Sequence, residues 1–131
     1  MRTTTFVVLF CLFLAPGVAR AQEEEVADKK FWAVSTFLIG STIYDIESTY
    51  FVLGKCKTCE EGNPIMRPFV KAGKPALYAA QGSIDAGVLY MSYKMKKGDT
   101  RFKKVWWLLP VAMAAGHMVA GTYNMRFAIR F

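Results

Sequence analysis

Apolar residues along this chain gather in three long segments, at about 31–53, 75–93 and 105–127, with polar stretches between them. Each segment is long enough to cross a hydrocarbon layer of about 30 Å as a helix. Polar side chains recur within the segments at steps of three and four residues, which places them on one face of each helix. The pattern predicts an all-α fold, a small transmembrane helical bundle of three spans within residues 31–131. Pro110 is expected to kink the third helix.

A shorter apolar run at residues 6–14 precedes these segments. It follows Arg2 and leads to an Ala-Arg-Ala sequence ending at Ala21, the arrangement of a secretory signal peptide. Residues 1–21 are therefore predicted to be a signal peptide, and residues 22–30 an acidic exported tail. The alternative is an uncleaved fourth helix, although the run is short for a span.

The formal net charge of +7 is concentrated beside the apolar segments. Basic residues cluster in the loop at 54–74 and again at 94–104, which suits lipid head groups and argues against a nucleic-acid partner. The leader favours an exported amino terminus, whereas the positive-inside preference for 94–104 favours the opposite orientation. We expect the bacterial cytoplasmic (inner) membrane, crossed several times, with the lipid bilayer as partner. Other membrane proteins or a second copy are further partners.

Ionisable side chains sit inside the apolar segments, where an unpaired charge is costly. At about 1.5 Å per residue, Asp45, Asp85 and His117 fall at a similar depth, so they can meet between the helices. Amide and hydroxyl groups share their helix faces and can hydrogen-bond between helices. The predicted polar cluster consists of Asp45, Thr49, Gln81, Asp85, His117 and Asn124.

This polar cluster allows three interpretations. The first is structural, with the polar groups satisfying one another. The second is a site that binds a cation or relays protons, because histidine titrates near neutrality and a buried carboxylate can be shifted toward it. The third is a metal-dependent enzyme. No cofactor is expected; a divalent cation is the alternative, and its ligands are unknown.

The loop between the first two segments contains Cys56 and Cys59 in a C-x-x-C spacing. This spacing suits a redox pair or half of a zinc site. A closed zinc site within one chain is not expected, because there is no second cysteine pair. An exported loop would carry a disulfide and a cytoplasmic loop two thiols.

The same loop contains Glu61, Asn63 and Pro64, which can form a well-capped turn. Together with the D-x-x-x-T of Asp45 and Thr49, this E-x-N-P motif and a late asparagine resemble a family of small bacterial membrane proteins catalogued only as a domain of unknown function. The resemblance implies about three helices and brings no activity. It also implies a shared polar set, which consists of Asp45, Thr49, Glu61, Asn63, Pro64 and Asn124.

The sequence thus predicts a small polytopic membrane protein, most simply a non-enzymatic accessory or interaction protein with a buried polar cluster. A cation-binding or proton-relay site within the bilayer is one alternative. Thiol–disulfide chemistry at Cys56 and Cys59 is another.

Overall fold

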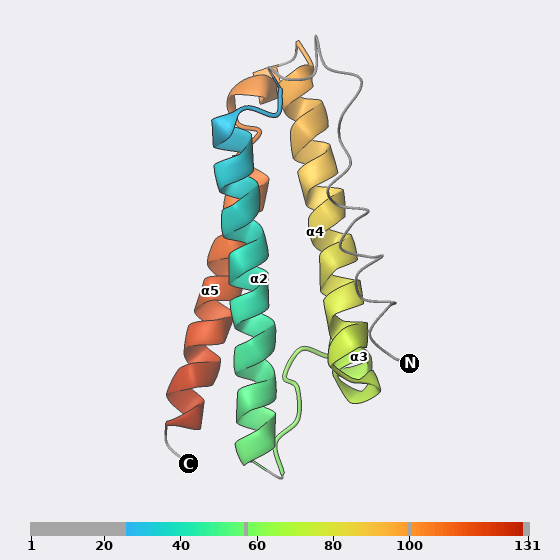
Figure 1. Ribbon diagram of the computed structural model, residues 1–131, viewed down its shortest axis with the longest axis vertical. Helices are drawn as coiled ribbons and strands as arrows, with labels where there is room; N and C mark the ends of the chain where they lie inside the picture. The colour runs from blue at the N-terminus through green and yellow to red at the C-terminus, as the bar shows by residue number, and fades with distance from the viewer. Residues whose placement is uncertain (1–25, 57, 100, 130–131) are drawn as a thin grey trace, which may run out of the picture.

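The computed structural model describes residues 26–56, 58–99 and 101–129, which are helical with no strand among them. The predicted signal peptide and residues 22–25 of the predicted acidic tail lie outside these residues. Figure 1 shows three long helices: α2 (Lys29–Lys55), α4 (Lys74–Lys97) and α5 (Leu108–Ala128). The short helix α3 (Arg67–Ala72) joins α2 to α4, and the 3-10 helix η1 (Arg101–Lys104) joins α4 to α5. The predicted all-α class is confirmed. We call the two ends of the bundle the loop end, near α3, and the turn end, near η1.

Local sequence explains where the helices begin. The carboxylate of Asp28 caps α2 by accepting a hydrogen bond from the Phe31 amide at 2.9 Å. Pro75 lies in the first turn of α4, as predicted, where its missing N–H would have no partner anyway. The expected kink at Pro110 was wrong, because α5 begins at Leu108 and Pro110 therefore also lies in a first turn.

A tight corner connects α3 to α4. Gly73 adopts φ +105°, a backbone conformation that residues with a Cβ rarely occupy, and its N–H donates to the carbonyl of Val70. The Tyr50 hydroxyl, from α2, donates to the same carbonyl at 3.1 Å. The corner thus holds α3 against the loop end of α2 as well as against α4.

The turn end is closed by aromatic and charged side chains. The rings of Phe31 and Trp106 lie 5.7 Å apart, and the ammonium of Lys96 lies 4.8 Å from the Trp106 ring centre. Lys96 also forms an ion pair with Asp28, and this contact lowers the pKa of the Asp28 carboxyl. The Trp32 ring packs on Phe31 as well, so Trp32 and Trp106 lie at the same end of the bundle.

The interior of the bundle contains many polar side chains. The apolar core is a small cluster of Leu38, Val88 and Ala114, one from each long helix, with Leu89 and Met113 against it. The buried polar residues are Ser35, Ser41, Thr42, Ser48, Thr49, Asp85 and Ser92. Several of these serines donate to carbonyls of their own helix, which satisfies the hydroxyl without a partner helix.

The outward faces carry large apolar side chains. Those with more than half of their surface exposed along the long helices include Trp32 (61%), Tyr90 (64%), Met91 (55%), Leu108 (54%), Val119 (71%) and Tyr123 (70%). The distribution of polar and apolar groups is therefore inverted relative to the ordinary pattern of a domain in water.

Helices α2 and α5 form the most extensive pair. Their backbones approach at Gly121, where an added Cβ would meet the Tyr44 ring at 2.6 Å and the Cα of Asp45 at 3.3 Å. Gly40, Gly82, Gly87 and Gly116 have no atom within 4 Å of such a Cβ. Close approach therefore depends on one glycine rather than on a stripe of small residues.

Within the part of the chain that the structure describes, no helix combines the length and apolar character that would carry it across a membrane.

Candidate functional site

Two carboxylates enter the bundle at the level of the single histidine. His117 Nδ1 on α5 donates to Asp45 Oδ2 on α2 at 2.8 Å, and both side chains are largely buried. Asp85 on α4 is 4% exposed and instead accepts a hydrogen bond from the Thr42 hydroxyl at 2.7 Å. The structure therefore brings Asp45 and His117 into contact and gives Asp85 a different partner on α2.

Two buried polar atoms of this region have no hydrogen-bond partner among the described residues. They are Oδ1 of Asp85 and Nε2 of His117. Each belongs to a side chain whose other polar atom is bonded to α2, so each could exchange a proton or hold a water molecule.

Closer to the loop end, Asn124 connects α5 to α2. Its amide nitrogen donates to the Thr49 hydroxyl at 2.9 Å and lies 3.3 Å from the Ser48 hydroxyl. Gln81, on α4, makes no hydrogen bond to any described residue. Of the two amides that were predicted to join helices, Asn124 makes the connection and Gln81 does not.

The E-x-N-P motif forms a turn before α3. The amide of Asn63 donates to Glu61 Oε1 at 2.8 Å, and the amide of Ile65 donates to Asn63 Oδ1 at 3.0 Å. Arg67 Nε donates to the Glu61 carbonyl at 3.0 Å. Pro64 lies inside this turn, where a fixed φ is an advantage.

This turn covers a small polar recess of about 120 Å³ between α2, α4 and α5. Its polar lining residues are Asp45, Thr49, Gln81, Glu61, Asn63 and Asn124. The recess therefore gathers every residue of the shared polar set named above except Pro64. Because Asp45 also holds His117, the recess continues into the polar interior of the bundle.

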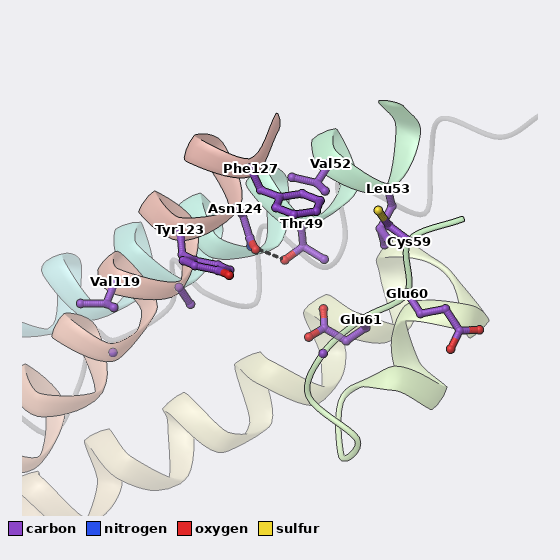
Figure 2. Close-up of a pocket in the computed structure, with 13 residues that line it drawn as sticks. Thr49, Val52, Leu53, Cys59, Glu60, Glu61, Val119, Tyr123, Asn124 and Phe127 are labelled. Carbon is purple, nitrogen blue, oxygen red and sulfur yellow. Dashed lines mark hydrogen bonds between the residues drawn. The ribbon is translucent and has the colours of Figure 1, made fainter. Parts of the chain in front are cut away.

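A larger groove of about 570 Å³ adjoins the recess and shares Thr49, Glu61, Ala120 and Asn124 with it. Its walls are mostly apolar side chains of α2 and α5, namely Val52, Leu53, Val119, Ala120 and Phe127. Figure 2 shows Glu61 on the loop, facing the hydrogen-bonded pair of Asn124 and Thr49, whereas the Glu60 side chain points away. The site therefore combines an apolar groove with the carboxylate of Glu61 at one side.

Cys56 and Cys59 form a disulfide that closes the turn just before Glu60 and Glu61. The bond fixes the start of the loop that borders the groove. Thiol–disulfide chemistry of this pair stays a prediction. Among residues 26–56, 58–99 and 101–129, no three His, Cys, Asp or Glu side chains gather closely enough to hold a metal ion.

Sequence reasoning missed several contributors. Thr42 was not proposed as the partner of Asp85, although its spacing from Asp45 and Thr49 places it on the same helix face. Glu47 follows Asp45 by two residues and so lies on another face of α2, where it accepts hydrogen bonds from Lys74 and Tyr78, both at 2.7 Å. The apolar walls of the groove carry no sequence motif that would have revealed them.

Comparisons with known proteins give one match. No curated protein and no solved structure matches the chain. A family described as a domain of unknown function, DUF5658, matches residues 36–129, which include the polar cluster, the E-x-N-P turn and both cavities. The chain therefore belongs to the DUF5658 family.

Proposed function

We propose that this chain is a polytopic integral membrane protein of the bacterial cytoplasmic membrane, with α2, α4 and α5 as its spans. In this proposal it is a non-enzymatic accessory or interaction protein. The observation that carries the proposal is the inverted distribution of side chains. Ser41, Ser92 and Asp85 are at most 4% exposed, while Val119 and Tyr123 are about 70% exposed.

A bilayer explains this inversion physically. Large apolar side chains on the outside of a bundle are not exposed to water when lipid surrounds them. Polar groups on the inside can hydrogen-bond to neighbouring helices. Mean hydropathy averages over all faces of a helix, so interior serines, threonines and carboxylates lower it without touching lipid. The tryptophans and lysines of the turn end suit the interface between hydrocarbon and water.

The polar interior supports a role that depends on packing. Asp45–His117, Thr42–Asp85 and Asn124–Thr49 each join α2 to another helix. No extramembrane domain accompanies the bundle in the described residues. A partner would therefore contact the apolar faces or the loop end, and a second copy of the chain could do the same.

The disulfide and the basic residues favour one orientation. A Cys56–Cys59 disulfide suits an exported loop, because cytoplasmic thiols are kept reduced. The lysines of the turn end, around η1, would then face the cytoplasm, which agrees with the positive-inside preference. This orientation differs from the one that the predicted leader favours.

Membrane fractionation tests the proposal directly. The full chain is expressed in a bacterium, and its membranes are washed with alkaline carbonate and separately with a mild detergent. We expect the protein to stay in the pellet after carbonate and to be released by detergent. Release by carbonate alone would refute a spanning arrangement.

A proton-relay site is the second candidate, favoured by the buried, unpartnered Asp85 Oδ1 and His117 Nε2. Purified protein in liposomes that enclose a pH-sensitive dye would be compared with Asp85→Asn under an imposed potential. A wild-type proton flux that the substitution removes would support the relay. Equal dye responses in wild-type, variant and empty liposomes would exclude it.

Thiol chemistry is tested by alkylation at the same loop. A membrane-impermeant maleimide is applied to intact cells before and after reduction. Labelling of Cys56 and Cys59 only after reduction would support an exported disulfide. Labelling without reduction, and only in permeabilised cells, would place two free thiols in the cytoplasm.

A further inference from the structure

We propose that the groove between α2, α5 and residues 59–62 of the loop binds one phosphatidylethanolamine molecule, with its ammonium at Glu61 and one acyl chain along α5. This inference rests on the proposed membrane location. It adds a ligand of defined chemistry to a site that has none assigned.

The dimensions of the groove fit an acyl chain. Its lining along α5 extends from Gly116 to Phe127, which is about 16 Å at 1.5 Å per residue. The lining of this stretch is apolar apart from Asn124, and Val52 and Leu53 of α2 form the opposite wall. A chain in this groove would run parallel to the helices, as lipid chains do in a bilayer.

The charge at the loop end selects the head group. Glu60 is already paired with Arg67 and Lys71, at 3.6 and 3.3 Å. No basic side chain of the described residues pairs with Glu61, which lines both the groove and the recess. Figure 2 shows that the Glu61 carboxylate faces the groove. A primary ammonium can donate hydrogen bonds to this carboxylate, and a quaternary ammonium cannot.

A basic group next to Glu61 completes the match to a zwitterion. Arg67 Nε donates to the Glu61 carbonyl at 3.0 Å, and the Arg67 side chain is 43% exposed. Phosphate is a preferred partner of arginine. A phosphoethanolamine head group therefore meets a carboxylate for its ammonium and a guanidinium for its phosphate.

Native mass spectrometry of the full chain in detergent tests the proposal. Phosphatidylethanolamine, phosphatidylcholine and phosphatidylglycerol with identical acyl chains are added in turn, and the lipid-bound fraction is measured. We expect one tightly bound phosphatidylethanolamine and weaker binding of the other two lipids. Glu61→Gln should reduce phosphatidylethanolamine binding about tenfold, the effect of losing one charge-assisted hydrogen bond.

Glu47→Gln is the matched control, because Glu47 carries the same charge but does not line the groove and is held instead by Lys74 and Tyr78. It should leave phosphatidylethanolamine binding unchanged. Ala120→Phe, which fills the groove, should weaken the binding of all three lipids to the same extent. Circular dichroism and the thermal transition confirm that each variant is folded.

Two results would overturn the inference. One is equal binding of the three lipids to the wild-type protein, and the other is an equal effect of Glu61→Gln and Glu47→Gln. Either result can occur in a protein that fractionates with membranes. Failure of the lipid inference is therefore distinct from failure of the membrane proposal.

Discussion

Helix α2 contacts its two long neighbours in different ways. Against α5 the backbones come close at Gly121, and polar contacts follow at Asp45–His117 and Thr49–Asn124. Against α4 the contact is less extensive, and the buried polar link that joins the two helices is the hydrogen bond from Thr42 to Asp85. The difference indicates that α2 and α5 form the fixed unit of the bundle and that α4 is attached to it at fewer points.

The largest effect should come from breaking the hydrogen-bonded pair of Asp45 on α2 and His117 on α5. Asp45→Ala leaves His117 buried without its partner, and we expect a loss of about 3 kcal/mol in stability, the cost of an uncompensated group in a buried pair. Thermal unfolding in detergent would measure the loss. Asp45→Asn, which keeps an acceptor, should lose less. Full stability of Asp45→Ala would show that the pair does not hold the helices together.

The close approach of the same two helices provides the next test. Gly121→Ala places a Cβ against the Tyr44 ring and the α2 backbone, and overpacking of this kind costs about 2 kcal/mol. Gly116→Ala, on the same helix with no atom within 4 Å of the new Cβ, should be neutral or stabilising. The two variants are compared by thermal unfolding. Equal midpoints would mean that α2 and α5 are not in tight contact at Gly121.

A smaller effect is expected between α2 and α4. Thr42→Val keeps the shape of the side chain and removes the hydroxyl that donates to Asp85. We expect a loss of about 1 kcal/mol, typical of one buried hydrogen bond. In the Thr42→Val variant, the backbone amide hydrogens of α4 should exchange faster than those of α5. Faster exchange in α5 instead would reverse our ranking of the two interfaces.

The smallest effect is expected at the exposed link to α4. Glu47 accepts from Lys74 and Tyr78 at the surface of the bundle, where solvent and salt weaken such pairs. Glu47→Gln should leave the thermal midpoint of the detergent-solubilised protein unchanged. A clear drop would indicate that this link is as important to α4 as the contact of Thr42 with Asp85.

Helical periodicity was sufficient for much of this architecture. The three long helices, the Asp45–His117 contact and the outward position of Glu47 follow from segment length and from steps of three and four residues. These features depend only on the geometry of single helices at roughly equal depth, which the sequence specifies.

Features that depend on how the helices are rotated and spaced relative to one another could not be predicted from the sequence. Several hydroxyls of α2 could have met Asp85, and only the packed bundle selects Thr42. Many glycines lie in the helices, and only Gly121 lies at a crossing point. The cavity walls are ordinary apolar residues, because a groove is a property of the space between elements. The E-x-N-P motif did mark Glu61 and Asn63, but not the recess that they cover.

The corner at Gly73 has a consequence for the loop before it. Residues 58–73 form a connecting segment that is held at both ends, by the Cys56–Cys59 bond on one side and by the reversal at Gly73 on the other. The maximum extension of a segment with two fixed ends is set by the number of residues between those ends. The length of this segment therefore sets the distance between Glu61 and α5. A single inserted or deleted residue would change the width of the groove between them.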